Sequence, residues 1–286
     1  MGKVKMRVWD VKHGNAIYVR TPNNKHLVFD LGVGDYSEGM DGRSPLETLK
    51  NHYGIDKIDY LMITHPHKDH IKDILNLDKL KLGPKTLHRP KSVDLDKLLE
   101  NVSTADRPLF DRYIKLDKTF VYPASSTNTT SNPENYGGVI FKHFSTPSLI
   151  DNINNLSIVT IMKYEGIKVI IPGDNECKSL DELMTKADFR AAVKDCDILI
   201  APHHGRQSAY HSEFVKLANP RITIVSDGSI CDTSANSAYS TNSRGLNVRY
   251  KGHLIPRKML TTNSDGEIYI DFGAGNANSY LKIEIK

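Results

Sequence analysis

A seven-residue segment behind an apolar run constrains this chain more than any other feature. Residues 58–63, Ile-Asp-Tyr-Leu-Met-Ile, are largely apolar, and Thr-His-Pro-His-Lys-Asp-His follows at 64–70. The segment holds four side chains of the kinds that bind metals, namely His65, His67, Asp69 and His70. Because side chains alternate faces along an extended strand, we expect His65 and His67 to project to the same side.

The spacing of this motif predicts two neighbouring ion sites. We expect His65 and His67 to bind one ion where the strand ends. Asp69 and His70 then lie in the turn that opens the next helix and point toward a second ion about 4 Å away. The order H-x-H-x-D-H is more specific than a lone H-x-H pair, and it disfavours a solvated polar loop.

An aspartate further along the chain can join the two ion sites. Asp174 follows the apolar run 168–171 through Pro172 and Gly173. Its two oxygens can bridge two cations and neutralise charge that would otherwise push the ions apart. The alternative is a simple turn aspartate, because Gly and Asp are both common turn formers. We expect Asp174 to be the bridging ligand.

A pair of histidines follows the next apolar run, at 197–200. His203 and His204 stand beside Gly205, whose missing Cβ lets the backbone approach a ligand closely. Adjacent side chains leave a strand end in different directions, so we expect only one of them to bind metal. We assign His204 as the ligand and His203 as the residue that reaches the substrate or a leaving oxygen. The reverse assignment stays open.

With these motifs the chain resembles the metallo-β-lactamase superfamily and, within it, the soluble hydrolase domain of the ComEC competence proteins. Residues 9–17 are similar to the family's D-V-G-Q-G-D-A strand turn, with Asn15 where aspartate is usual. Residues 28–32, Val-Phe-Asp-Leu-Gly, are similar to its I-D-x-G element. The remaining elements N-N-x-S, G-D-x-E and H-H-G follow in the family's order, at 154–157, 173–176 and 203–205.

The resemblance implies an α/β fold, the metallo-β-lactamase αβ/βα sandwich. Two mixed sheets then face each other, with helices outside and the metals at one edge. We expect residues 1–286 to form a single hydrolase domain with an insertion at about 75–136. Helix-like stretches at 93–102 and 105–114 and a polar loop at 125–133 fall within this insertion. Residues 260–268 resemble the family's closing hairpin, and Asp265-Gly266 predicts its tight turn.

Two departures from the family pattern concern the metal centre and the substrate. Most dinuclear members supply another histidine where Asn154 and Asn155 stand here, although ComEC-type enzymes resemble this chain in carrying asparagines. We therefore expect one metal position to be more open, filled by water, an amide oxygen or substrate, and we assign Asn155 to substrate binding. We interpret His143 as a strand histidine that faces solvent or a sheet edge. A histidine-proline pair of the family is missing, and Tyr239 is its suggested replacement.

Composition favours one catalytic domain in a reducing compartment. The 286 residues, 39% of them hydrophobic, are enough to bury a large core. The three cysteines, Cys177, Cys196 and Cys231, are widely spaced and odd in number, so we expect no disulfide framework and treat all three as structural. The sequence has no stretch that resembles a signal peptide or a membrane span, and we expect a cytoplasmic protein.

The net charge of +4 permits nucleic-acid binding without requiring it. The densest basic stretch, 79–91, carries Lys79, Lys81, Lys85, His88, Arg89 and Lys91. It is either a nucleic-acid surface or an ordinary solvated face. Arg206, where the family usually has serine, is the better candidate for a phosphate contact, because an arginine can donate two bonds to phosphate oxygens. A surface arginine that points away from the cleft is the alternative.

We predict a metal-dependent hydrolase that cleaves phosphodiesters of a nucleic acid, DNA or RNA. Two divalent ions would orient the ester, lower the pKa of a bridging water and stabilise the leaving oxygen. Asp69 would help to take the proton of that water. Histidine and carboxylate ligands without cysteine suit zinc or manganese. A small-molecule esterase, such as a lactonase or a phosphorylcholine-type phosphodiesterase, and an inactive metal-binding interaction module are the alternatives.

Overall fold

The apolar runs of the chain assemble into two mixed β-sheets. The computed structural model describes residues 2–33, 43–100, 102–229, 231–276 and 278–285. Within these ranges one sheet has nine strands, in the spatial order β12 (His253–Arg257), β11 (Leu246–Tyr250), β15 (Ser279–Ile285), β14 (Ile268–Ala274), β1 (Lys3–Val8), β2 (Ile17–Arg20), β3 (His26–Phe29), β4 (Tyr60–Met62) and β5 (Leu87–His88). The other described sheet has six strands, in the order β13 (Met259–Thr261), β10 (Ile222–Val225), β9 (Ile198–Ile200), β8 (Ile167–Ile171), β7 (Val159–Tyr164) and β6 (Ile140–Phe144).

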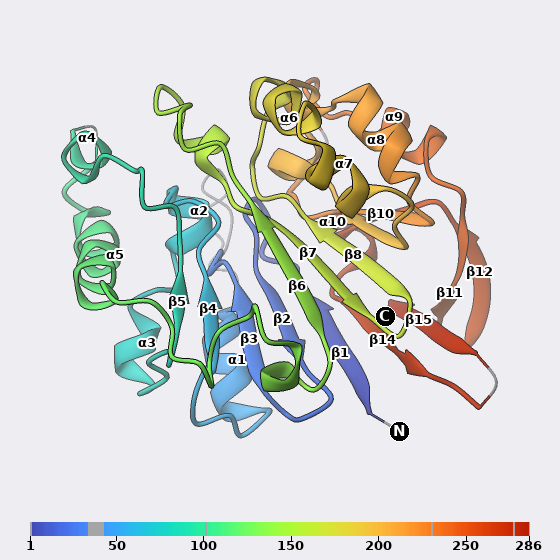
Figure 1. Ribbon diagram of the computed structural model, residues 1–286, viewed down its shortest axis with the longest axis horizontal. Coiled ribbons are helices and arrows are strands. Elements are labelled where there is room, and N and C mark those ends of the chain that lie inside the picture. Colours follow the sequence, from blue (N-terminus) through green and yellow to red (C-terminus); the bar gives the residue numbers. More distant parts are fainter. Residues whose placement is uncertain (1, 34–42, 101, 230, 277, 286) are drawn as a thin grey trace.

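Alternating side chains explain why the two sheets face each other. In β1, Val4, Met6 and Val8 are buried, whereas the residues between them are exposed or only partly buried. The inward residues of both sheets meet in one apolar layer, in which Met6 shares a cluster with residues such as Ile171 and Ile224. Each fully buried aliphatic side chain of this kind contributes about 1.5–3 kcal/mol. In Figure 1 the six-stranded sheet, with β6, β7 and β8 in front, overlies the blue strands of the larger sheet.

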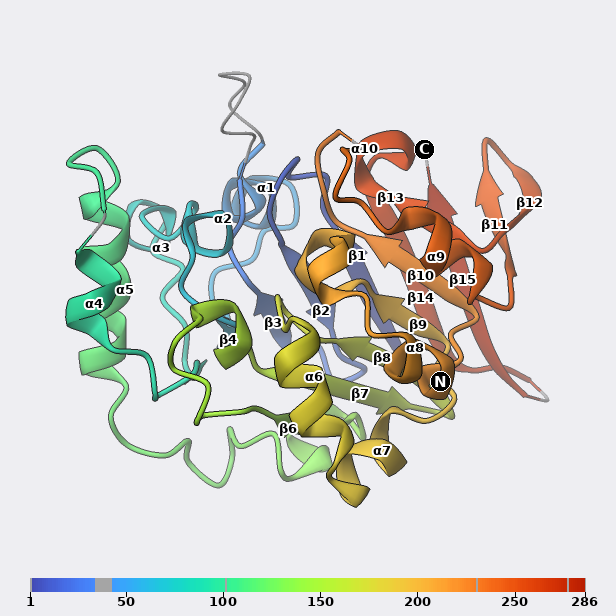
Figure 2. The same ribbon diagram turned by 90° about the horizontal axis from the view of Figure 1, so that it is seen from above.

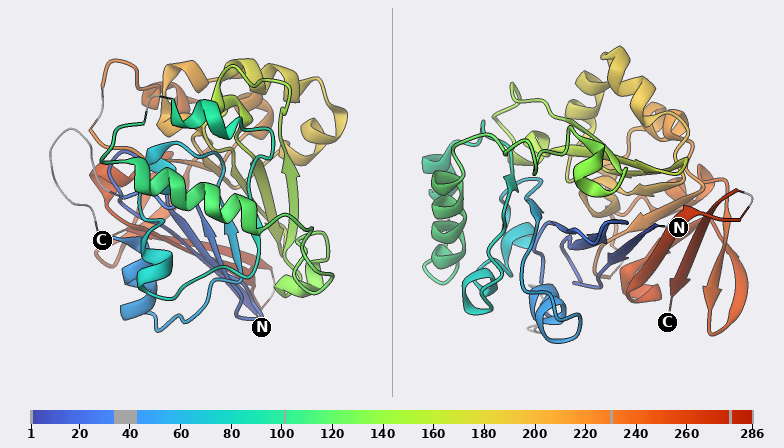
Figure 3. Two further views of the ribbon diagram at one scale, coloured as in Figure 1. Left: turned by 90° about the vertical axis from the view of Figure 1, so that its left-hand side faces the viewer. Right: turned by 60° about the horizontal axis from the view of Figure 1, so that its bottom comes forward.

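Helices cover the outer side of the six-stranded sheet and the part of the nine-stranded sheet formed by β2 to β5. The nine-stranded sheet packs against α1 (Pro45–Asn51), α2 (Lys68–Ile71), α3 (Asn76–Lys79), α4 (Leu95–Leu99) and α5 (Arg107–Thr119). The six-stranded sheet packs against α6 (Cys177–Met184), α7 (Ala187–Val193), α8 (Ser212–Ala218) and α9 (Asn236–Thr241). In the left-hand view of Figure 3, α5 lies across the near side of the molecule. The predicted sandwich of two mixed sheets with helices outside is confirmed.

The segment at about 75–136, which the sequence predicts to be an insertion, contributes a strand to the nine-stranded sheet. Helices occur near both predicted stretches, as α4 and α5, and no helix or strand is assigned among the described residues 120–132. However, β5 pairs in parallel with β4 and forms the edge of the nine-stranded sheet. A short strand of two residues carries too little periodicity to be recognised in the sequence.

The predicted closing hairpin at 260–268 is wrong. β13 pairs with β10 in the six-stranded sheet, whereas β14 pairs with β1 and β15 in the other sheet. The one-turn helix α10 (Thr262–Asp265) and Gly266 therefore carry the chain from one sheet to the other. Asp265-Gly266 is a genuine break between strands, but local turn chemistry does not reveal which sheet each strand joins.

No described helix has the length and apolar character that a membrane crossing would require. Four short 3-10 helices complete the described secondary structure: η1 (Pro133–Tyr136), η2 (Ile153–Leu156), η3 (Pro202–Gly205) and η4 (Gln207–Ala209). Two of them, η2 and η3, contain residues that border the site described next.

Candidate metal centre

Three loops bring the predicted ligands to one edge of the sandwich. β3, β4 and β5 run parallel in one sheet, and β8, β9 and β10 run parallel in the other. The carboxyl ends of parallel strands meet at the same edge of a sheet, which is the usual place for a binding site in open α/β folds. The segments after β4, β8 and β9 carry the histidine motif, Asp174 and His203-His204. This edge faces the viewer in Figure 2.

Four of the predicted ligands form a tight cluster. Ligand atoms of Asp69, His70, Asp174 and His204 all lie within 4.8 Å of one another. His204 Nε2 is 2.9 Å from Asp69 Oδ2 and 3.2 Å from Asp174 Oδ2. His70 Nε2 is 3.3 Å from Asp174 Oδ1 and 3.6 Å from Asp69 Oδ2. Two carboxylates and two imidazoles around one point are a donor set that suits a divalent cation.

His65 and His67 form a second set of ligands beside Asp174. His65 Nε2 is 3.1 Å from His67 Nδ1 and 3.8 Å from Asp174 Oδ2. The side chains project together because the backbone from Thr64 to His67 is not helical and α2 begins only at Lys68. Asp174 is therefore shared between the two sets, because its Oδ2 atom lies 3.8 Å from His65 Nε2 and 3.2 Å from His204 Nε2.

The backbone conformation at the histidine pair is unusual for residues with side chains. His203 and His204 have φ angles of 46° and 52°, so both lie in the left-handed region. Such conformations cost of order 1–3 kcal/mol each and cluster at functional sites. The strain turns the two rings apart: His204 is buried in the ligand cluster, whereas His203 lies outside it, with Nδ1 3.2 Å from Glu176 Oε1.

Second partners hold the ligand rings in position. His204 donates its Nδ1–H to the carbonyl of Ser226 at 2.8 Å, which leaves Nε2 facing Asp69 and Asp174. The Nδ1 atom of His70 lies 2.8 Å from Asp30 Oδ2. Carboxylates and carbonyls behind histidine ligands commonly orient the ring and raise its basicity.

Asp30 is the centre of this supporting network. It is fully buried and accepts hydrogen bonds from the Thr64 backbone N–H at 2.7 Å, the Thr64 hydroxyl at 2.8 Å and the Asn15 amide at 2.9 Å. Asn15, which replaces the family's aspartate, is thus a structural donor. The sequence places Asp30 in the I-D-x-G element, a signal that could have identified this supporting role.

Gly173 allows the Asp174 loop to approach the histidine motif. Its φ is +61°, and an added Cβ would lie 2.8 Å from Ser157 Cβ and 2.9 Å from Thr64 Cβ. Ser157 also accepts the backbone N–H of Asp174 through its hydroxyl oxygen at 3.0 Å. The close packing of these loops is what fixes the carboxylate of Asp174 between the two histidine sets.

Charge in the cluster favours a cation. Burial acts to lower the pKa of His204, but the carboxylates of Asp174 and Asp69 raise it to about 10. Burial likewise opposes the raised pKa of His70, which Asp174, Asp30 and Asp69 produce. Burial acts to raise the pKa of Asp69, yet His70 and His204 hold it below its ordinary value. Two buried carboxylates thus require positive charge between them, supplied by protons or by metal.

The ligand rings fit a metal ion at the atomic level. His70 Nε2 is buried and has no hydrogen-bond partner among the described residues, although it faces the cluster. In the second set, burial and the neighbouring His70 hold the pKa of His65 well below its ordinary value. This ring is therefore neutral and can donate a lone pair. The donor set, the orphaned nitrogen and the neutral His65 all fit divalent ions held by His65, His67, Asp69, His70, Asp174 and His204.

Asn154, rather than Asn155, borders the metal ligands. Asn155 is buried, and its side-chain oxygen accepts the backbone N–H of Glu176 at 3.0 Å. It therefore supports the loop after Asp174 and is not accessible to a substrate in this structure. Asn154 lies beside His67, and its Oδ1 atom is buried without a partner among the described residues. An amide oxygen thus stands near the position where the third histidine is usual.

Arg206 lies at the rim of the site and is bound to an acidic neighbour. Its guanidinium is 3.0 Å from Asp227 Oδ2, and it also contacts Cys231 Sγ. His13, which the sequence did not single out, lies between this pair and the ligands. Its Nδ1 is 2.8 Å from Asp227 Oδ1 and its Nε2 is 3.6 Å from Asp69 Oδ2. The position of His13 beside Gly14, in the strand-turn motif at 9–17, is the sequence signal that could have identified it.

Four minor expectations need correction. Gly205 packs against Val225. A Cβ added to Gly205 would lie 3.1 Å from Val225 Cγ1, so the missing Cβ serves packing and not a ligand. Tyr239 is fully buried beneath the helices and does not replace the missing pair. His143 lies in the edge strand β6 as expected, but it does not face solvent: it is half-buried, and its ring packs edge-on against His88 at 4.6 Å between ring centres. Cys231 is exposed, unlike a structural cysteine.

Comparison with known proteins gives a family and a set of similar folds. Residues 9–226 match the family model described as the metallo-beta-lactamase superfamily. No curated protein matches the chain. A diphosphatase of the PhnP family aligns over 94% of this chain and 98% of its own, at 10% identity and a TM-score of 0.48.

Two further solved structures align with this chain. Zn²⁺-bound PqqB from Methylobacterium extorquens aligns over 91% of this chain and 97% of its own, at 11% identity and a TM-score of 0.46. A long form of RNase Z from yeast aligns over 81% of this chain and 38% of its own, at 10% identity and a TM-score of 0.39. At such low identities and TM-scores, no property of these proteins is carried over to this chain.

Proposed function

The chain belongs to the metallo-beta-lactamase superfamily, and we propose that it is a metal-dependent phosphodiesterase that acts on nucleic acid. The observation that carries the proposal is the arrangement of two ligand sets around Asp174. Two neighbouring divalent ions can orient a phosphodiester, supply a nucleophile at neutral pH and stabilise the leaving oxygen. The resemblance of the motifs to ComEC-type hydrolase domains supports the same substrate class.

The residues of the chain have separable tasks in this proposal. Asp69 is a carboxylate whose pKa His70 and His204 hold low against the effect of burial, so it can accept a hydrogen bond from the attacking water. His203 stands outside the ligand cluster beside Glu176 and is positioned to act on the leaving oxygen. Asp30 keeps His70 and the histidine loop in place.

The surroundings of the centre favour a phosphodiester over a carboxylic ester. A cavity of about 490 Å³ at the same edge has a mixed lining, in which Lys91, Ser92 and Ser145 stand beside Pro90, Phe144, Pro147 and Ile158. Arg206 and His13 add cationic or hydrogen-bonding groups on the opposite rim. A lactone or a lipid-like ester would need a larger apolar surface to be held.

Incubation with several substrates tests the proposal. Purified protein is given labelled DNA, labelled RNA, a chromogenic phosphodiester and a lactone, each with zinc or manganese and each again with a chelator. We expect chelator-sensitive cleavage of a nucleic acid and of the chromogenic phosphodiester. Cleavage of the lactone alone would replace the proposal by an esterase. Bound metal without turnover of any of them would indicate an inactive binding module.

A further inference from the structure

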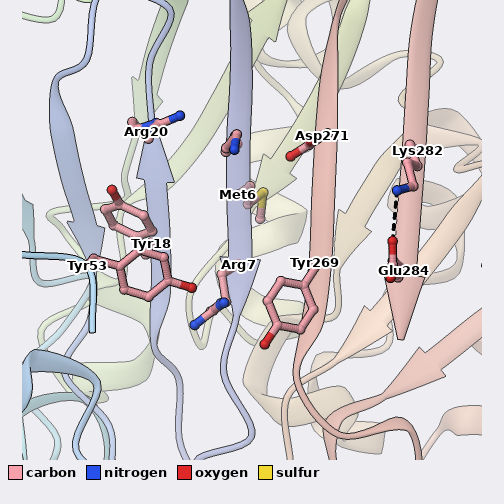
Figure 4. A pocket seen from close by; sticks show the side chains of 10 residues that line it. Met6, Arg7, Tyr18, Arg20, Tyr53, Tyr269, Asp271, Lys282 and Glu284 are labelled. Carbon is pink, nitrogen blue, oxygen red and sulfur yellow. Dashed lines mark ion pairs between the residues drawn. The ribbon is translucent and has the colours of Figure 1, made fainter. Parts of the chain in front are cut away.

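The outer face of the nine-stranded sheet holds a cavity that the metal centre does not use. The register pairs Lys5 and Arg7 of β1 with Arg20 and Tyr18 of β2, and these side chains lie on the face away from the layer between the sheets, where Tyr18 is buried and the other three are partly buried. A cavity of about 400 Å³ opens over them, bounded on one side by Tyr53 after α1 and on the other by β14 and β15. Figure 4 shows this face with its side chains.

One level of the cavity is a row of stacked planar groups. The guanidinium of Arg7 lies 4.7 Å from the ring centre of Tyr53 and 4.2 Å from that of Tyr269. Tyr18 lies beneath Tyr53, with ring centres 6.0 Å apart. Tyr53 is 43% exposed, so one face of the row is open to solvent. Exposed rings held in this way are platforms on which nucleobases stack.

The next level of the cavity is cationic. Lys5 lies opposite Arg20 of β2 on one side and opposite Asp271 of β14 on the other, and the like-charged pair of Lys5 and Arg20 destabilises the sheet. Neither has an acidic group within ion-pair distance in the described part of the chain. The nearby carboxylates of Asp271 and Glu284 are instead 2.9 Å from Lys3 and 2.8 Å from Lys282. An anion between Lys5 and Arg20 would offset their repulsion.

The two levels match the shape of a nucleotide. Arg7 and Lys5 are two residues apart in β1, as are Tyr18 and Arg20 in β2, so the levels are about 6.6 Å apart. A nucleotide can span this separation with its base on the tyrosines and its phosphate at the cations. Figure 4 shows Tyr18, Tyr53, Arg7 and Tyr269 at one level and Arg20 at the other.

We propose that this outer face binds single-stranded nucleic acid, with a phosphate between Lys5 and Arg20 and a base on the row of Tyr53, Arg7 and Tyr269. An acidic peptide would satisfy the cations but leave the rings unused, and a duplex hides the faces of its bases. The inference rests on the proposed function only in taking nucleic acid as the polymer. The face would hold a part of the strand remote from the bond that is cleaved.

Binding in the presence of a chelator separates this inference from turnover. Fluorescence anisotropy of a labelled oligothymidylate of about 16 nucleotides, a site size within the range of known single-strand binders, reports the affinity at several salt concentrations. For the double variant Lys5→Gln with Arg20→Gln we expect a weaker affinity. We also expect a salt dependence of log K that is flatter by about 0.7 for each phosphate that the variant no longer neutralises. Tyr53→Leu should lower the affinity by about 5- to 100-fold.

The matched control removes the same charge elsewhere. Lys178 in α6 and Lys216 in α8 are exposed on the helices outside the other sheet, and Lys178→Gln with Lys216→Gln should leave the salt slope unchanged. Equal losses of affinity in both double variants would overturn the inference, because binding would then follow net charge alone. Arg20→Gln, at the end of β2, serves as a milder variant if the double variant fails to fold.

Two readouts distinguish the possible failures. If polyglutamate competes as well as the oligonucleotide and Tyr53→Leu has no effect, the face binds acidic polypeptides and the nucleic-acid assignment is overturned. Hydrolysis of the chromogenic phosphodiester should be unchanged in Lys5→Gln with Arg20→Gln, because neither residue is at the metal centre. If the parent protein cleaves no phosphodiester but still binds oligothymidylate through this face, only the proposed function fails.

Discussion

At the scale of single residues, the site combines histidines whose pKa values are shifted in opposite directions. His65 and His67 have pKa values lowered chiefly by burial, whereas carboxylates raise the pKa of His204 to about 10. Asp174 touches both groups, so its removal affects more than one ligand position. Because each proposed ligand would donate to a metal at short range, the effect of a single substitution should be visible directly in the metal content.

We expect His65→Ala and His67→Ala to lose most of one ion per chain, and Asp174→Ala to lose both, since Asp174 is shared between the sets. Elemental analysis of the purified, folded variants measures this content. His253→Ala, an exposed histidine in β12, is the control and should keep the parent content. Full metal occupancy in Asp174→Ala would refute the shared-ligand assignment.

The two adjacent histidines should separate binding from turnover. His204→Ala removes a nitrogen that lies 2.9 Å from Asp69 and should lower metal content. His203→Ala should keep the metals and reduce kcat by about 10²- to 10⁴-fold, the range for loss of a general acid or base. Metal analysis and steady-state rates on both variants measure the two effects. If His203→Ala loses metal and His204→Ala does not, the roles of the two histidines are reversed. If neither substitution changes metal content or rate, the pair is not part of the active site.

At the scale of secondary-structure elements, the two sheets are joined at one side by a pair of histidines. His88 in β5 and His143 in β6 belong to the edge strands of different sheets, and their rings are 4.6 Å apart. Burial lowers the pKa of His88 to about 4 and that of His143 to about 3. Both rings are therefore neutral in the folded protein at mildly acidic pH.

These lowered pKa values make the packing of the two rings sensitive to acid. Between pH 6.5 and about 4 the unfolded chain binds protons that the folded protein does not, so stability falls as the pH falls. At pH 5 each histidine should lower the free energy of unfolding by about 2 kcal/mol. Each pH unit below the ordinary pKa of histidine contributes about 1.36 kcal/mol. Between pH 7.5 and pH 5, we expect the free energy of unfolding of the His143→Gln variant to fall by about 2 kcal/mol less than that of the parent protein.

Urea unfolding of both proteins at the two pH values measures the difference. Other buried groups titrate as well, such as Asp73, whose pKa burial raises to about 6, but they contribute equally to parent and variant. Replacement of exposed His253 by Gln gives the control value. An identical loss of stability in the parent and in His143→Gln would show that the histidine pair is not responsible.

At the scale of the whole molecule, the basic residues are distributed over opposite edges. Lys79 and Lys81 lie before β5, at the edge opposite the histidine motif, and Lys85 pairs there with Asp59. Arg89 lies beyond β5, where it is buried and bound to Asp117 at 2.7 Å. The stretch 79–91 therefore does not form one continuous surface, and a part for it in nucleic-acid binding stays a prediction.

We expect Lys79→Gln with Lys81→Gln to leave both the KM for a nucleic-acid substrate and its salt dependence unchanged. Both lysines are exposed at the far edge, so they bind no phosphate near the cleaved bond. Arg206→Gln, at the rim of the site, should raise KM in the same assay because it removes a cationic donor to a phosphate oxygen. A flatter salt dependence in the lysine variant would show that this stretch is part of the surface that binds nucleic acid.

Local sequence determined the elements and much of the centre. The apolar runs before His65, Asp174 and His203 are recognisable because a strand's period is short and local, and the turn residues after them are equally local. The strands β8 and β9 lie within a residue of the predicted runs. The spacing of the H-x-H-x-D-H motif likewise dictates that its ligands share one strand end.

Only the tertiary structure decided how these segments meet. The choice of Asn154 over Asn155 depends on how η2 packs against Glu176, and the hydrogen bond between His13 and Asp227 joins residues 214 positions apart. The pairing of Lys5 with Arg20 follows from the register of β1 and β2, and the separation of β13 from β14 follows from the sheet each one joins. Such pairings are selected by the packing of the whole chain, because a residue's local neighbours carry no information about its distant partners.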